Sequence, residues 1–128
     1  MLQKFKKAIP VIAMVLLFSS TIVYAYDLEK YMSPGEVAYT ALRKKSTENN
    51  YAKVVSIVSP NSSSIRYVVL NSEGYPKSEQ KTANEVSTIY LSYDGYNVQK
   101  GDYVKLKAQN NAADNSGRFV TLQMDWTP

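Results

Sequence analysis

Beyond residue 50 the chain alternates between short apolar stretches and polar clusters. The apolar stretches are rich in β-branched and aromatic residues, and the clusters contain Ser, Asn, Gly and Pro, a pattern typical of strands separated by turns. Residues 51–58 are apolar on both faces, which indicates a central strand. Strands are predicted over residues 51–58, 65–70, 86–93, 102–109 and 117–126, with a surface loop over residues 71–85.

The last two predicted strands show the clearest period of two. Apolar side chains occupy alternate positions in each, so each strand should have one buried and one wet face. An antiparallel hairpin across the loop at 110–117 keeps both apolar sets on one face of a sheet. The predicted register places Val104 opposite Met124, Leu106 opposite Leu122, and Ala108 opposite Val120.

The segment from residue 33 to residue 50 fits two structures. Ser33, Pro34 and Glu36 match a helix start with a capping box, and the basic residues 43–45 suit a helix C-terminus. The same segment also fits the first arm of a hairpin. The pattern alone leaves strand and helix open for residues 34–46.

Three short motifs give the chain a family resemblance. Arg43–Ser46 (RKKS) precedes Tyr51–Val54 (YAKV), and Trp126–Pro128 (WTP) ends the sequence. In these motifs the chain resembles a group of small exported Gram-positive bacterial proteins of uncharacterised function. The resemblance implies a small all-β domain in which residues 37–45 form a strand rather than a helix.

Pattern and resemblance together predict an all-β fold, a small antiparallel β-sandwich or barrel-like domain. We expect residues 26–36 to be an N-terminal extension and residues 37–128 to be the β-domain.

The first 25 residues have the pattern of a secretory signal peptide. A lysine-rich start precedes an apolar run over residues 8–23, and Val23 and Ala25 occupy the small-residue positions of a cleavage site. An uncleaved anchor is the alternative, but Pro10 and residues 19–21 interrupt a run already shorter than the roughly 20 apolar residues that a membrane span needs. The sequence predicts a secreted, extracellular protein, cleaved after Ala25, that meets the membrane only during export.

Removal of the signal peptide changes the charge of the protein. The full chain has 15 basic and 11 acidic side chains. Three lysines lie before residue 26, so the exported part has 15 − 3 = 12 basic residues against 11 acidic ones, a net charge of +1. Such a low net charge gives no sign of a nucleic-acid partner.

The missing residue types limit the chemistry. The chain contains no His and no Cys. A Ser-His-Asp triad, a thiol nucleophile and an ordinary zinc site therefore have no residues from which to form. Most of the carboxylates lie in predicted loops or on outer faces, where nothing raises the pKa of a general acid. We expect a non-catalytic protein without a cofactor.

The loop at 110–117 carries side chains that suit calcium. Asn110, Asn111, Asp114 and Asn115 offer oxygen ligands, but their spacing does not match an EF-hand loop. Asn, Asp and Gly are equally typical of hairpin loops, and we expect no metal site.

Tyrosines and a basic segment are the candidate binding residues. Tyr93 shares the inner face of its predicted strand and should be core. An exposed ring is large, rigid and amphipathic, which suits a sugar or protein ligand, although tyrosine is also a good strand former. The Asp94-Gly95 pair predicts a turn near the rings. The predicted ligand-binding set is Tyr90, Tyr96 and Tyr103, clustered around Tyr96, and the predicted surface-basic set is Arg43, Lys44 and Lys45.

The leading functional hypothesis is an exported, non-catalytic binding or interaction module of the cell surface or medium, with an extracellular glycan or protein as partner. The alternative is a secreted antagonist of bacteriocin or toxin type, which small size and export allow. A structural matrix component whose strands pair edge to edge is a third possibility.

Overall fold

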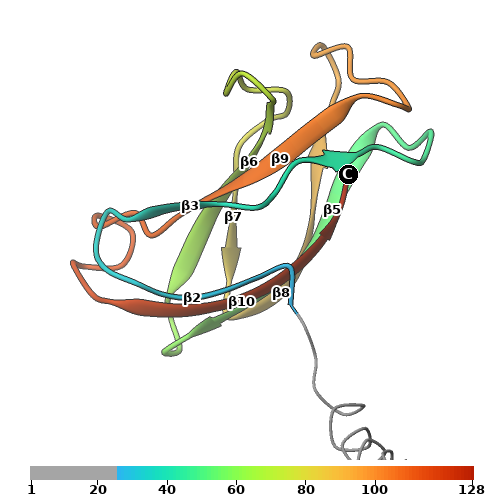
Figure 1. Cartoon of the computed structure of the whole chain (residues 1–128). Coiled ribbons are helices and arrows are strands. Elements are labelled where there is room, and N and C mark those ends of the chain that lie inside the picture. Colours follow the sequence, from blue (N-terminus) through green and yellow to red (C-terminus); the bar gives the residue numbers. More distant parts are fainter. Residues whose placement is uncertain (1–25) are drawn as a thin grey trace, which may run out of the picture.

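Residues 26–128 are described by a computed structural model, in which they form nine strands and no helix. The strands make two antiparallel sheets packed face to face, so the predicted all-β sandwich is confirmed (Figure 1). Within these residues no helix has the length and apolar character required to cross a bilayer. The predicted signal peptide and its cleavage after Ala25 lie outside the described residues.

Each sheet has its own strand order. The first sheet runs β2 (Leu28–Met32), β10 (Val120–Thr127), β5 (Tyr51–Ser59) and β8 (Val86–Ser92). The second sheet runs β3 (Val37–Tyr39), β9 (Tyr103–Gln109), β6 (Ser64–Asn71) and β7 (Lys81–Asn84), and β4 (Arg43–Lys44) also pairs with β9. β5 lies between two neighbours, as its two apolar faces predicted.

Two boundaries differ from the predictions. The expected extension at residues 26–36 contains β2, which pairs with β10, so the domain begins before residue 37. The expected loop at residues 71–85 contains β7, which pairs with β6. Both strands lie at sheet edges and are short and rich in polar residues, so they lack the apolar alternation that marks the other strands.

The predicted hairpin of the last two strands is wrong. β9 belongs to the second sheet and β10 to the first. Their apolar sets are nevertheless all buried, because they meet across the core instead of side by side. Alternation shows that a strand has one apolar face, but two strands satisfy it equally well as neighbours or as facing layers.

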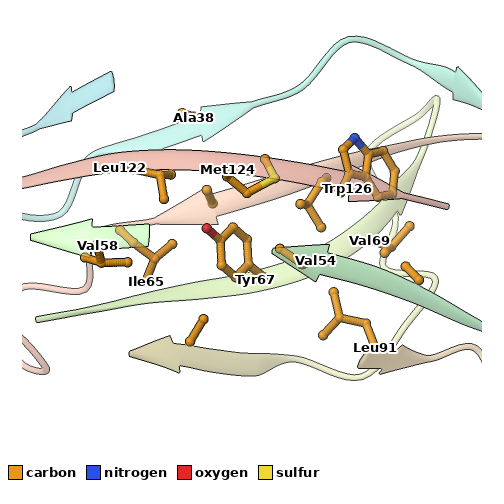
Figure 2. Packing of buried hydrophobic residues seen from close by; sticks show 14 of the residues in the cluster. Ala38, Val54, Val58, Ile65, Tyr67, Val69, Leu91, Leu122, Met124 and Trp126 are labelled. Atoms are coloured by element: carbon orange, nitrogen blue, oxygen red, sulfur yellow. The ribbon is translucent and has the colours of Figure 1, made fainter. Parts of the chain in front are cut away.

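The core lies between the two sheets. Figure 2 shows Leu122, Met124 and Trp126 of β10 over Ile65, Tyr67 and Val69 of β6. One buried hydrogen bond crosses this core, between the Tyr67 hydroxyl and Ser56 Oγ at 2.8 Å. Burial raises the pKa of the Tyr67 phenol and the Ser56 bond partly offsets the rise, so Tyr67 stays neutral and joins the two layers.

The segment from residue 33 begins with a turn, so the helix alternative is wrong. The Glu36 N–H donates to the Ser33 carbonyl at 3.0 Å, and Gly35 has φ +81°, outside the helical region. The capping-box contact exists all the same: the Ser33 N–H donates to Glu36 Oε1 at 2.8 Å. β3 and β4 follow, so the strand that the resemblance implied for residues 37–45 is present as two short strands separated by residues 40–42.

The loop at 110–117 carries the chain from the second sheet to the first and is fastened by two buried amides. The Asn115 amide donates to the Ser64 carbonyl at 2.7 Å and accepts from the Ser64 N–H at 2.8 Å. The Asn110 amide donates to the carbonyls of Met32, Ser33 and Arg118 at 2.9–3.0 Å. A further bond at 2.7 Å joins Asn115 Nδ2 to Asn110 Oδ1.

Candidate functional site

The strands of the second sheet carry only cationic side chains among their charged residues. They contain no Asp or Glu, and their basic residues are Arg43, Lys44, Arg66, Lys81, Lys105 and Lys107. Because Val104, Leu106 and Ala108 are buried, the intervening residues of β9 point outward. We call the outward set the basic face; it consists of Tyr39, Lys44, Arg66, Tyr103, Lys105 and Lys107.

Strand pairing brings these residues together. Lys44 lies opposite Tyr103, and Tyr39 lies opposite Lys107. Directly opposed residues point to the same side of a sheet, so both pairs share the outer surface. Lys105 Nζ lies 4.9 Å from the centroid of the Tyr39 ring, a cation–π contact.

Within residues 26–128, three of the four cations of the basic face have no ion pair. Arg66 pairs with Asp114 at 3.0 Å. Within residues 26–128 no carboxylate lies in salt-bridge range of Lys44, Lys105 or Lys107. Their charge is therefore available to a ligand.

A cleft of about 380 Å³ opens at one end of the basic face. Two loops, residues 72–80 and 93–102, project at this end of the sandwich (Figure 1). Among the described residues Asp102 is the one carboxylate that lines the cleft, and its Oδ2 accepts the Gln99 N–H at 2.9 Å within a turn. The lining residues are Asn71, Ser72, Lys77, Asn97, Val98, Gly101, Asp102, Tyr103 and Val104.

The three predicted tyrosines lie apart. Tyr103 is 57% exposed and belongs to both the basic face and the cleft. Tyr96 is half-buried, and its carbonyl accepts a bond at 3.4 Å from Lys77, a cleft residue. Tyr90 points outward from the first sheet, where its ring meets Tyr51 edge-on at 5.2 Å. The expected single cluster around Tyr96 is therefore wrong, because Tyr90 and Tyr103 face away from opposite layers.

Two expectations for residues 93–96 are confirmed. Tyr93 is 1% exposed and belongs to the core. The Tyr96 N–H donates to the Tyr93 carbonyl at 2.9 Å, which closes a turn over Asp94 and Gly95. Burial raises the pKa of the Tyr93 phenol.

The basic segment does not form one surface patch. Of its three residues only Lys44 is exposed, and it lies on the basic face. Arg43 points the other way and joins the two sheets: Nη2 donates to Asp27 Oδ1 at 2.7 Å, and Nη1 donates to the Trp126 carbonyl at 2.5 Å. Burial of the Asp27 carboxylate opposes its ionisation, but the bonds from Arg43 and the Trp126 N–H lower its pKa overall.

Lys45 contradicts the predicted surface-basic set most directly, since it is 1% exposed. Its ammonium donates to the carbonyls of Thr47 and Asn49 at 2.8 and 2.5 Å and lies 5.4 Å from the centroid of the Tyr93 ring. Burial lowers the pKa of Lys45, and the charge of Glu48 partly offsets this. The polar loop after residue 45 folds over the ammonium group and supplies the oxygens that water would otherwise provide.

The two buried amide side chains of the 110–117 loop have a structural role. Asn115 Oδ1 is occupied by the Ser64 N–H and Asn110 Oδ1 by Asn115 Nδ2, so neither oxygen is directed at an ion. In the described part of the chain no three His, Cys, Asp or Glu side chains gather as a metal site would require.

Sequence reasoning missed four members of the basic face: Tyr39, Arg66, Lys105 and Lys107. A signal for two of them was present, because Lys105 and Lys107 follow Tyr103 at intervals of two and must share its face. The positions of Tyr39 and Arg66 depend on pairing between strands distant in sequence. No protein-family model matches the chain and no curated protein matches it, so its own residues carry the functional argument.

Proposed function

We propose that the protein is an exported, non-catalytic binding module whose basic face binds an anionic glycan polymer outside the cell. One observation carries this proposal. The outward positions of a sheet without acidic residues bring the unpaired ammonium groups of Lys44, Lys105 and Lys107 beside the exposed rings of Tyr39 and Tyr103.

The spacing of the face suits a repeating ligand. A strand rises about 3.4 Å per residue, so Tyr103, Lys105 and Lys107 lie about 7 Å apart along β9. Regularly spaced cations match a polymer with a negative charge on each repeat unit. The tyrosine rings offer flat amphipathic surfaces for sugar faces, and the cleft adds donors and acceptors for hydroxyl groups.

The test is a binding titration of residues 26–128 against defined polymers. Polygalacturonate supplies carboxylates, poly(glycerol phosphate) supplies phosphodiesters, dextran is a neutral glycan, and single-stranded DNA is a non-glycan polyanion. The double variant Lys105→Gln/Lys107→Gln removes two charges. At about 1 kcal/mol per lysine near an anionic surface, we expect about 30-fold weaker binding to the preferred anionic glycan.

The matched control is Lys53→Glu, which changes the net charge by the same two units on the outer face of the first sheet. It should change affinity less than about threefold, because the two faces are separated by the core. Equal losses in the control and the double variant would show a net-charge effect and overturn the assignment to this face. Equal affinity for dextran would show that the ligand need not be anionic. Tighter binding to DNA would show that the face does not select a glycan.

A further inference from the structure

β8 forms one edge of the first sheet, and no strand within residues 26–128 pairs with its outer side. Two bonds at its end show how its backbone is oriented. The Ser92 N–H donates to Glu79 Oε2 at 3.0 Å and the Ser92 carbonyl accepts the Glu79 N–H at 3.2 Å, so both groups point away from β5. Alternate residues of an antiparallel strand point the same way, so the backbone groups of Thr88 and Tyr90 also face outward.

The other sheet edges are protected, whereas β8 is covered only at Ser92, by Glu79. β2 carries Glu29 and Lys30, β7 has four residues including Lys81, and β3 has three residues. Short length and charge are the usual means by which an edge avoids pairing with another chain. β8 has seven residues, none of them charged.

The outer surface beside this edge is mostly apolar, with Lys53 opposite Tyr90 as its charged residue. On β8, Val86 is 77% exposed and Tyr90 is 47% exposed. Their neighbours on β5 include Val55 and Tyr51, each 39% exposed. The apolar strip therefore reaches the unpaired edge, where a second strand would extend it.

We propose that two copies of this chain pair through β8 in antiparallel orientation, around a twofold axis beside Thr88. In this register Thr88 lies opposite the partner's Thr88, and Val86 lies opposite the partner's Tyr90. The outward-pointing backbone groups then bond to each other, and the side-chain pairs are Thr with Thr and aliphatic with aromatic, both favourable across strands. A second copy is the occupant because β8 complements itself in this register and its own seven residues carry no charge.

The pairing has a consequence for ligand binding. A twofold axis between antiparallel strands is perpendicular to the sheet, so it keeps each face of the sheet on its own side. Both basic faces of the dimer therefore point to the same side. A long anionic chain could contact both faces at once, which strengthens attachment without any new contact.

The first test is sedimentation equilibrium of residues 26–128, the exported chain with its whole described sandwich, from about 1 µM to about 1 mM. We expect a concentration-dependent mass that reaches that of a dimer. Thr88→Glu places two like charges at the axis and should weaken dimerisation at least tenfold, whereas Thr121→Glu, on the same outer face at β10, should not. A monomeric mass over the whole range overturns the proposal, as does equal dissociation of both variants.

The second test uses the absence of cysteine from the chain. Opposed Cα atoms in a hydrogen-bonded antiparallel pair lie about 5.5 Å apart, within the range of a disulfide. Thr88→Cys should form a covalent dimer under mild oxidation much faster than Thr121→Cys. Equal rates show random collision and overturn the register. Binding of the isolated Val86–Ser92 peptide without self-association of the intact chain assigns the edge to a foreign strand instead. Neither assay contains a polymer, so its outcome is independent of glycan binding.

Discussion

Asn115 is the residue whose replacement tests the described fold most sharply. Its side chain makes three buried hydrogen bonds, two to the backbone of Ser64 and one to Asn110 Oδ1. These bonds fasten the loop that links the two sheets to the start of β6. Asn115→Ala removes all three and leaves the Ser64 N–H and carbonyl without these partners.

The size of the effect follows from the contacts. A typical intramolecular hydrogen bond contributes about 0.5–1.5 kcal/mol, and a buried group left without a partner costs about 1–3 kcal/mol. Partial entry of water reduces the second contribution, so we expect Asn115→Ala to lower the free energy of unfolding by about 3 kcal/mol. A domain of this size has a stability of about 5–15 kcal/mol, so the loss is a large share of the total.

Urea unfolding followed by tyrosine and tryptophan fluorescence measures this loss. With an m-value of about 1–2 kcal/mol per M urea, the midpoint should fall by about 1.5–3 M. Asn115→Asp adds a second reading. In this variant the carboxylate faces the Ser64 carbonyl and Asn110 Oδ1 without a proton to donate, so the folded pKa of the new carboxyl group is raised. The variant should therefore be most stable below the unfolded pKa of about 3.9 and should lose stability as pH rises through the folded pKa. A loss below about 1 kcal/mol for Asn115→Ala would refute the structural role.

Two further predictions concern groups that join the sheets. Asp27 has a lowered folded pKa, so the stability from its bond to Arg43 is present above the unfolded value of 3.8 and is lost as pH falls through the folded pKa. Arg43→Ala should cost about 1–2 kcal/mol at pH 7 and less once Asp27 is protonated in acid, where only the bond to the Trp126 carbonyl remains; a pH-independent cost in urea titrations contradicts this. Tyr67→Phe leaves the Ser56 hydroxyl without its partner and should cost about 1–2 kcal/mol, whereas adding Ser56→Ala should recover part of the loss; strictly additive costs in the double-variant cycle contradict the bond.

Local pattern predicted which segments are strands more reliably than how they pair. Val104 and Leu122 were correctly assigned to buried faces, because alternation depends only on neighbours along the chain. The hairpin between their strands was wrong because the same alternation serves two strands in one sheet or in facing sheets. The side chains that decide the choice are Asn110 and Asn115, whose partners lie up to 78 residues away in sequence.

The basic segment shows a different limit. Residue type alone predicted that Arg43, Lys44 and Lys45 share a surface. In the structure Arg43 bonds across the two sheets, Lys44 faces solvent, and the Lys45 ammonium donates to backbone carbonyls. In a strand, consecutive side chains alternate between faces, so a run of like charges along the sequence cannot form one patch. Charges at intervals of two residues can form one patch, as Lys105 and Lys107 do on β9.

A low net charge is a poor guide to the ligand of this protein. Net charge sums the whole surface, whereas a bound polymer responds to charges within a Debye length, about 10 Å at 0.1 M salt. The strands of the second sheet contain six basic residues and no acidic one, while those of the first contain Lys30 and Lys53 against Glu29 and Asp125. Residues 26–128, whose net charge is +1, thus present one strongly cationic face. If that face binds the polymer, affinity should fall steeply between 0.05 and about 0.5 M salt, and the Lys105→Gln/Lys107→Gln variant should show a shallower fall. Parallel salt curves for the variant and the parent chain would mean that these lysines do not contact the polymer.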